Sequence, residues 1–285
     1  MGCPPVPDAW RYPRPRNVPE LLGARWVRVA FIGLLAGFTS GLFGVGGGIV
    51  IVPALAVLAG FPHKLATGTS LTAIIPIAIA GVGGYASGGE VDWTVALCVS
   101  VGAIAGAVAG TRLLVRLRTP LLKLIFAGLI VAVAIRMFLG EADAPGRPDL
   151  TVGTAAAMVL LGVGAGVIAG LLGVGGGIII VPVLTIAFGI PHVLAKGTSL
   201  AVIVPTAIMG TLRNRRSGLT ALVPAVVVGA GGVVSAPVGA RLALALDETI
   251  ARALFAVLLV LTAVRLVRDA VRERRADARL ANGEI

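Results

Sequence analysis

The stretch GLFGVGGGIVIVP at Gly41–Pro53 returns almost unchanged as GLLGVGGGIIIVP at Gly170–Pro182. The same shift in numbering, without a gap, relates FPHKLATGTSL at Phe61–Leu71 to IPHVLAKGTSL at Ile190–Leu200. Between residues 37 and 81, 27 of 45 positions are identical to their counterparts under this shift. The chain therefore has two homologous halves, and we expect each half to form one structural repeat.

The composition around these motifs indicates that most of the chain is solvated by lipid. Of its 285 residues, 57% are hydrophobic and 13% are charged, and the mean hydropathy is +1.01. A soluble domain carries roughly 25% charged residues, so this chain has too little polar surface to fold in water. The formal charge of +11 gathers at the ends and in short gaps between apolar runs, which argues against a nucleic-acid partner.

Ten apolar runs follow one another along the chain. They lie at residues 27–44, 46–60, 66–86, 93–115, 121–139, 150–172, 175–189, 195–212, 219–244 and 250–267. A helix needs about 20 apolar residues to cross a bilayer, so the runs at 46–60 and 175–189 are too short to span it. We predict an all-α polytopic membrane protein with two repeats of about five helical segments each and short, broken helices at its centre.

The charges in the gaps between these runs predict the topology. We divide the chain into a cytoplasmic arm (1–26), a first membrane repeat (27–139), a connecting loop (140–150), a second membrane repeat (151–268) and a basic cytoplasmic tail (269–285). Basic loops stay in the cytoplasm. The acidic gap at Glu90 and Asp92 is equivalent to the basic gap at Arg215 and Arg216, so the two repeats should be inverted. The expected location is the bacterial inner membrane, with both termini in the cytoplasm.

Each GVGGG segment lies between a long apolar run and a short one. Four glycines in five residues disfavour a helix and leave the backbone N–H groups bare. Bare backbone in hydrocarbon is tolerated only beside protein partners or a water-lined cavity, and the helix that follows points its positive end at the turn. We therefore predict that Gly46, Gly47 and Gly48, with Gly175, Gly176 and Gly177, bind an anion facing a cavity. Close packing of helices by these small residues is the alternative.

The GTSL elements add hydroxyl groups that can donate to an oxyanion. The predicted binding residues are Thr69, Ser70, Thr198 and Ser199, together with Lys196, which replaces Thr67 of the first half. The serines could instead bond their own helix backbone, and Lys196 could extend its amine to the membrane surface. The four-residue spacing of Gly102, Gly106 and Gly110 predicts a packing seam instead of a site.

The apolar runs contain no Asp or Glu. This absence argues against carboxylate catalysis and against clustered metal ligands. We expect no enzymatic activity, no catalytic residue, no metal and no cofactor. The expected partners are a small anionic substrate and the lipid bilayer, and the sequence allows a homodimer.

The paired GLFGVGGGIVIVP and GTSL elements resemble those of the TauE/SafE family of sulfite exporters, also called the four-toluene-sulfonate uptake permease family. The resemblance covers residues 27–267 and implies transport of sulfite, sulfoacetate or a related organosulfonate. With the cytoplasm negative, export of an anion needs no coupled ion, so we expect a secondary transporter that exports its substrate by membrane potential. An anion channel remains an alternative. Proton-coupled uptake, with His63 and His192 as proton carriers, is another.

Overall fold

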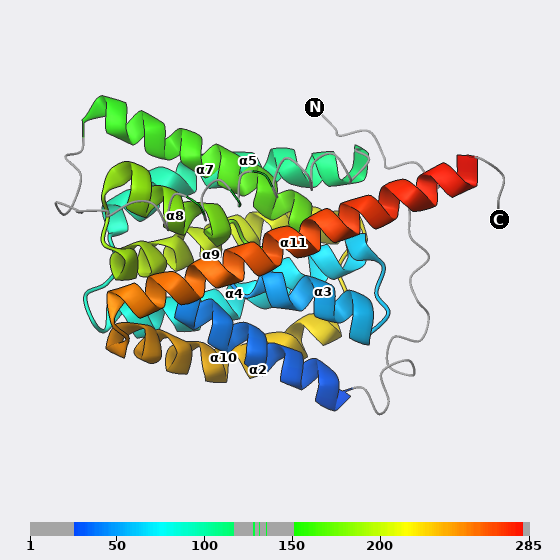
Figure 1. Cartoon of the computed structure of the whole chain (residues 1–285), viewed down its shortest axis with the longest axis horizontal. Helices are drawn as coiled ribbons and strands as arrows, with labels where there is room; N and C mark the ends of the chain where they lie inside the picture. The colour runs from blue at the N-terminus through cyan, green and yellow to red at the C-terminus, as the bar shows by residue number, and fades with distance from the viewer. Residues whose placement is uncertain (1–25, 117–127, 129–130, 132–134, 136–150, 282–285) are drawn as a thin grey trace.

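The computed structural model describes residues 26–116, 128, 131, 135 and 151–281, and its regular elements are α-helices (Figure 1). The first half contains α2 (Trp26–Phe43), α3 (Gly48–Leu58), α4 (His63–Ala86) and α5 (Trp93–Arg116). The second half contains α7 (Val152–Leu172), α8 (Gly177–Phe188), α9 (His192–Arg216), α10 (Leu222–Ala245) and α11 (Glu248–Ala281). The all-α prediction is confirmed for these residues. The arm before residue 26, the loop at 140–150 and most of the run at 121–139 lie outside them.

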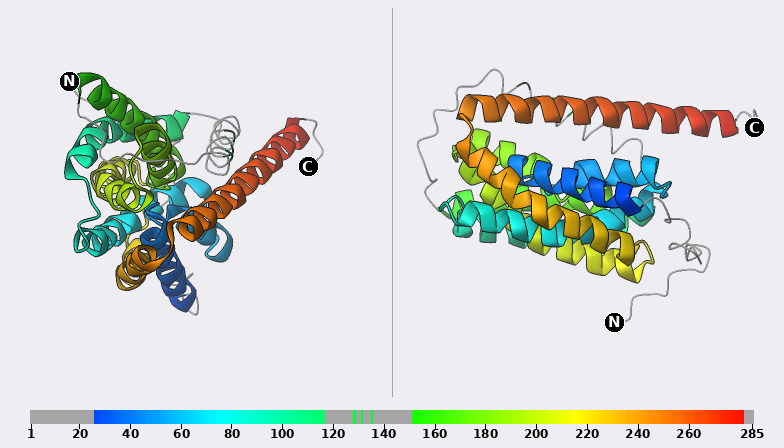
Figure 2. Two further views of the ribbon diagram at one scale, coloured as in Figure 1. Left: turned by 60° about the vertical axis from the view of Figure 1, so that its left-hand side comes forward. Right: turned by 90° about the horizontal axis from the view of Figure 1, so that it is seen from below.

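Six helices in the described ranges are long and apolar enough to cross a bilayer, namely α2, α4, α5, α7, α9 and α10. The two short runs form the short helices α3 and α8, of 11 and 12 residues. Figures 1 and 2 show α3 turning back beside α2, so that the glycine turn between them lies inside the molecule. The prediction of a polytopic protein with short helices at its centre is confirmed.

The two halves are interlocked, because their outer helices pair with each other. Helix α2 packs along α10, and α5 packs along α7. Glycines allow this close approach: a Cβ atom at Gly106 would lie 2.9 Å from the backbone nitrogen of Val167, nearer than real Cβ atoms come. The predicted seam at Gly102, Gly106 and Gly110 therefore packs directly against the backbone of α7.

Helices α4 and α9 are equivalent in sequence and lie antiparallel at the centre. A Cβ at Gly197, near the start of α9, would lie 2.9 Å from Cβ of Tyr85, at the end of α4. A Cβ at Gly68, near the start of α4, would lie 3.2 Å from Cβ of Asn214, at the end of α9. Equivalent helices thus run in opposite directions, which is the geometry that inverted halves require. Their orientation in a bilayer stays a prediction.

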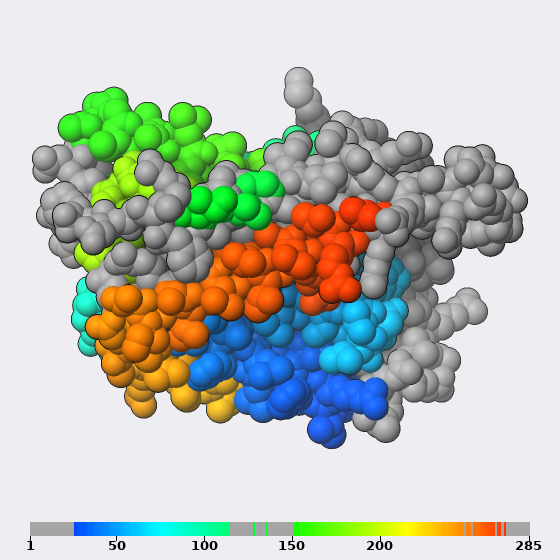
Figure 3. All heavy atoms as spheres, in the orientation of Figure 1, coloured from blue at the N-terminus to red at the C-terminus, as the bar shows by residue number. Residues whose placement is uncertain are grey.

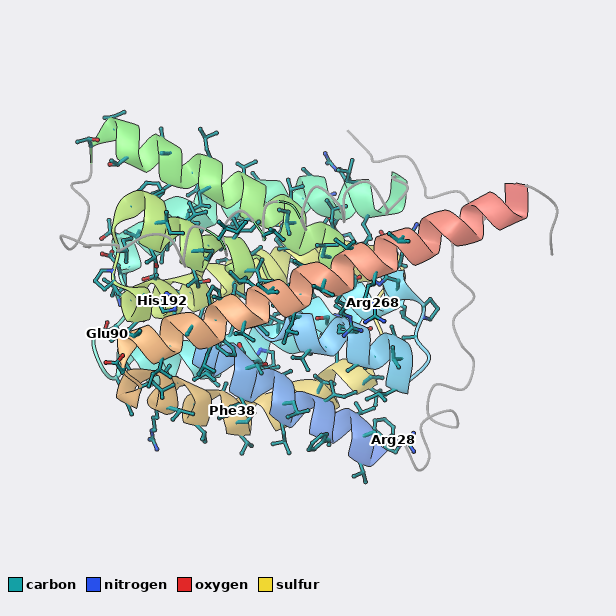
Figure 4. The ribbon with its side chains drawn as sticks, in the orientation of Figure 1. Arg28, Phe38, Glu90, His192 and Arg268 are labelled. Carbon is teal, nitrogen blue, oxygen red and sulfur yellow. The ribbon has the colours of Figure 1, made fainter. Side chains whose placement is uncertain are left out.

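Glu90 and the basic end of α9 lie at opposite ends of the molecule. Figure 4 shows Glu90 and His192 at one end, and Arg28 and Arg268 toward the other. Because α9 begins at His192 and is antiparallel to α4, its basic end at Arg213–Arg216 lies at the end that carries Arg28. The positive-inside rule would place this basic end in the cytoplasm, although Arg241 lies at the Glu90 end, where Gly84 faces Ala240.

Helix α11 crosses the front of the molecule and covers the junction of the two halves (Figures 1 and 3). Its buried Phe255 contacts Phe43 of α2, with ring centroids 5.9 Å apart, and His192 of α9, with centroids 5.5 Å apart. The helix continues without a break to Ala281. The predicted basic tail is therefore helical over most of its length.

Candidate functional site

The two glycine turns meet at the centre of the molecule. A Cβ at Gly48 would lie 2.5 Å from Cα of Val174, and a Cβ at Gly177 would lie 2.7 Å from Cα of Val45. The turns are buried and touch backbone against backbone. Three glycines in each turn have positive φ: Gly44 (70°), Gly46 (86°), Gly47 (75°), Gly173 (71°), Gly175 (91°) and Gly176 (86°). L-residues with side chains rarely adopt this conformation, which explains why the motif needs glycine.

Each turn leaves backbone N–H groups without an acceptor at the start of a short helix. The carbonyl of Gly47 accepts from Val50 and Ile51, at 3.0 and 3.1 Å, and no side chain caps α3. The second turn repeats this pattern at Gly176. Within the described residues, the N–H groups of Gly46 and Gly47 donate no hydrogen bond, nor do those of Gly175 and Gly176. Orphan donors at two helix N-termini are the feature that oxyanion sites use.

Ser70 and Ser199 join each half to the glycine turn of the other. The hydroxyl of Ser70 donates to the carbonyl of Gly173 at 2.8 Å, and that of Ser199 donates to the carbonyl of Gly44 at 2.9 Å. The two bonds are equivalent, because each runs from a serine of one half to the corresponding glycine of the other half. A hydroxyl has one proton to donate, so in this conformation both serines hold the turns and have no proton left for a ligand.

Thr69 and Thr198 form a second pair of exchanged bonds. The hydroxyl of Thr69 accepts from the N–H of Ala221 at 3.0 Å, and that of Thr198 accepts from the N–H of Asp92 at 2.9 Å. Positions 92 and 221 are again equivalent in the two halves. Both pairs of bonds recur with the two halves exchanged, as a pseudo-twofold arrangement of the halves would require.

Lys196 lies beside the first glycine turn, at a position where the other half has the uncharged Thr67. Its side chain is completely buried, with an exposed fraction of 0%, so it does not extend to the surface in this conformation. A Cβ at Gly44 would lie 2.6 Å from Cα of Lys196, as one at Gly173 would lie 2.8 Å from Cα of Thr67. One turn therefore has a lysine as its neighbour and the other a threonine.

The turns are enclosed in this conformation, although the sequence predicted an open cavity. A Cβ at Gly46 would lie 3.2 Å from Cδ1 of Ile203, and one at Gly175 would lie 3.3 Å from Cγ2 of the same residue. A hollow of about 10 Å³ touches the first turn, enough for about one water molecule. Its lining residues are Thr39, Val45, Gly47, Ile49, Val50 and Leu258. An anion could reach the bare N–H groups only if the turns moved apart.

The structure places Ser70, Ser199 and Lys196 beside the turns, whereas Thr69 and Thr198 bond Ala221 and Asp92. Three further buried polar residues were not predicted. Ser40 is buried one helical turn before Gly44, and its hydroxyl forms no hydrogen bond with the described residues. Tyr85 is buried and donates to the carbonyl of Gly41 at 2.7 Å. Asn214, the equivalent of Tyr85, is also buried. The signal was available, because these positions depart from the repeat: Ser40 aligns with an alanine, and Tyr85 with an asparagine.

Residues 9–137 and 158–283 match the protein family described as sulfite exporter TauE/SafE. The chain belongs to this family. The match includes both glycine turns and both GTSL elements.

Relatives of this TauE/SafE chain are described as probable membrane transporter proteins. A probable membrane transporter protein of Xylella fastidiosa (strain 9a5c) is 38% identical over 111 residues, which are 38% of this chain and 42% of the relative. The alignment thus covers less than half of that relative. The probable membrane transporter protein YdhB of Bacillus subtilis (strain 168) is 26% identical over 217 residues, or 75% of this chain and 88% of the relative. No solved structure matches the chain.

Proposed function

We propose that this transporter moves a small sulfur oxyanion, either sulfite or an organosulfonate such as sulfoacetate, across the bacterial inner membrane. One observation carries the proposal: two turns with unbonded N–H groups meet at the centre of the molecule, inside a chain of the TauE/SafE family. Backbone N–H groups at helix N-termini suit a tetrahedral or pyramidal oxyanion because they donate without a side chain.

The substrate would occupy the space created when the two turns separate. Gly46, Gly47 and Gly48 would donate from one side, and Gly175, Gly176 and Gly177 from the other. Thr69, Thr198, Ser70 and Ser199 would complete the coordination, since breaking the bonds from the serines to the turns frees their protons for the anion. The amine of Lys196 would add positive potential on one side of the site.

Alternating access follows from the equivalence of the halves. Each half contacts the other through the same pairs of residues, so exchange of conformations between them would open the site first to one side of the membrane and then to the other. Each negative charge that leaves a cell gains about 2.3 kcal/mol per 100 mV of membrane potential. Export therefore requires no coupled ion.

Two other functions share this geometry. An anion channel could be lined by the same turns, and proton-coupled uptake could use His63 and His192, which open the equivalent helices α4 and α9. The direct contact of the turns favours a transporter over a channel, because a closed centre must rearrange for each passage. A purely structural role for the glycines, as a packing motif, is the alternative explanation of this contact.

Transport of sulfite into or out of liposomes containing the purified protein tests the proposal. The expected flux saturates with sulfite concentration and responds to an imposed potential, with an inside-negative potential accelerating exit. Empty liposomes provide the control. Saturable flux that ignores the potential would contradict uniport, whereas flux that does not saturate would favour the channel.

A further inference from the structure

Asn214 is a buried polar residue whose amide lacks a partner. It lies near the end of α9, only 1% of its surface is exposed, and among the described residues its Nδ2 atom forms no hydrogen bond. Its main-chain carbonyl is bonded, because it accepts a hydrogen bond from the N–H of Leu219 at 2.9 Å. A buried donor without an acceptor costs free energy, so such groups in native proteins usually meet a ligand or an ordered water.

The equivalent position in the other half has no such unpaired donor. Tyr85 occupies it, and its hydroxyl donates to Gly41. The same contrast recurs six residues later: the hydroxyl of Thr220 is buried and unbonded within the described chain, whereas its equivalent is the apolar Val91. Two positions thus carry unpaired polar groups at one end of the molecule and satisfied or apolar groups at the other.

Both residues lie against the start of the GTSL element of the first half. A Cβ at Gly68 would lie 3.2 Å from Cβ of Asn214. Thr220 directly precedes Ala221, whose N–H donates to Thr69. This end of α9 also carries Arg213, Arg215 and Arg216. The unpaired groups therefore lie at the basic end of α9, next to Gly68 and Thr69 of the first GTSL element.

We infer that Asn214 and Thr220 form a second binding subsite for a small oxyanion, on the route between the arginine loop and the glycine turns. The inference rests on the proposed function. The arginines concentrate anions at this end of the protein. The amide and the hydroxyl then donate hydrogen bonds without a fixed charge, so the anion is held weakly enough to move on. The opposite end, with Tyr85 and Val91, lacks this subsite.

The substitutions Asn214→Leu and Thr220→Val test the inference, because each removes the donor and keeps a side chain of similar size. The matched control is Val91→Thr, which adds a hydroxyl at the equivalent position of the other end. In liposomes, we expect KM for sulfite supplied on the side of Arg215 to rise about tenfold in either subsite variant, as the loss of one hydrogen bond to an anion predicts. We expect the control to keep the wild-type KM.

Stability separates a binding role from a structural one. Removing an unpaired buried donor should leave the melting temperature of the protein in detergent unchanged or higher, because no internal bond is lost. An unchanged KM in both subsite variants, with saturable flux in the wild type, would overturn the inference and leave the proposed function standing. A lower melting temperature with unchanged KM would assign the two residues to an internal water. Absence of saturable flux in the wild type would overturn both proposals.

Discussion

Ser70 and Ser199 link side-chain chemistry to the pairing of the two halves. Each is completely buried, and each donates to a carbonyl of the opposite glycine turn. A carbonyl left without its donor in a buried site loses more free energy than the bond itself contributes, since it cannot recover a water molecule. These two bonds therefore hold the turns in the closed arrangement.

Replacing either serine with alanine should destabilise the protein by a similar amount. We expect Ser70→Ala and Ser199→Ala each to lower the free energy of unfolding in detergent by about 1–3 kcal/mol, because each leaves one buried carbonyl unpaired. Ser87→Ala is the control, since the hydroxyl of Ser87 is exposed and bonds its own helix. Loss of stability in one serine variant only would contradict the equivalence of the two bonds.

The repeated motifs predicted that Ser70, Ser199 and Lys196 lie near the turns, but not which hydrogen bonds the two serines form. The repeated motif places glycines, hydroxyls and Lys196 in one region, because identical segments fold identically. Whether Ser70 donates to a ligand, to its own helix or to Gly173 depends on how the halves approach each other, and no local pattern encodes that approach. The enclosure of Gly46 by Ile203 was unpredictable for the same reason.

At the scale of elements, the apolar runs predicted the central parts of the helices accurately and the ends of the helices less accurately. The run at 195–212 became α9, which extends from His192 to Arg216. Hydropathy marks the residues that hydrocarbon can solvate, whereas a helix continues into the polar interface as long as its residues favour it. The helical continuation of α11 beyond residue 268 has the same explanation.

The seam between α5 and α7 depends on glycines, which have no side chain to hold the two helices apart. We expect Gly106→Leu to reduce the amount of folded protein and its melting temperature sharply, because the new side chain would meet the backbone of α7 at Val163 and Val167. Gly164→Leu is the matched control, since Gly164 has open space around it. Size-exclusion chromatography and thermal unfolding in detergent provide the measurements. Normal folding of the Gly106 variant would contradict the packing described for this seam.

On the scale of the whole molecule, the two halves form one body. The constant shift between the repeated motifs predicted the two halves, but not that α2 would pair with α10 and α5 with α7. Similar apolar surfaces could equally have closed each half upon itself, and no motif in the sequence decides between these arrangements. This interlocking matters for the proposed transport, because movement of either half would change the surface around the glycine turn of the other half.

Topology can be tested with two equivalent positions. In a background with Cys3 and Cys98 replaced by alanine, we expect Ser87→Cys and Arg216→Cys to react with a membrane-impermeant maleimide from opposite sides of the membrane. Residue 87 should be labelled from outside intact cells and residue 216 only after permeabilisation, since basic loops stay inside. Labelling of both from one side would contradict inverted halves.

The central claim is that two bare glycine turns, brought together by equivalent halves, bind the transported oxyanion. The most direct measurement is a structure of the protein with selenite, a heavier analogue of sulfite whose selenium can be located by anomalous scattering. We predict a selenium peak between the turns at Gly46–Gly48 and Gly175–Gly177, with the turns farther apart than in the closed structure. A transport-competent protein whose selenium lies elsewhere, while the turns stay in contact, would contradict the claim.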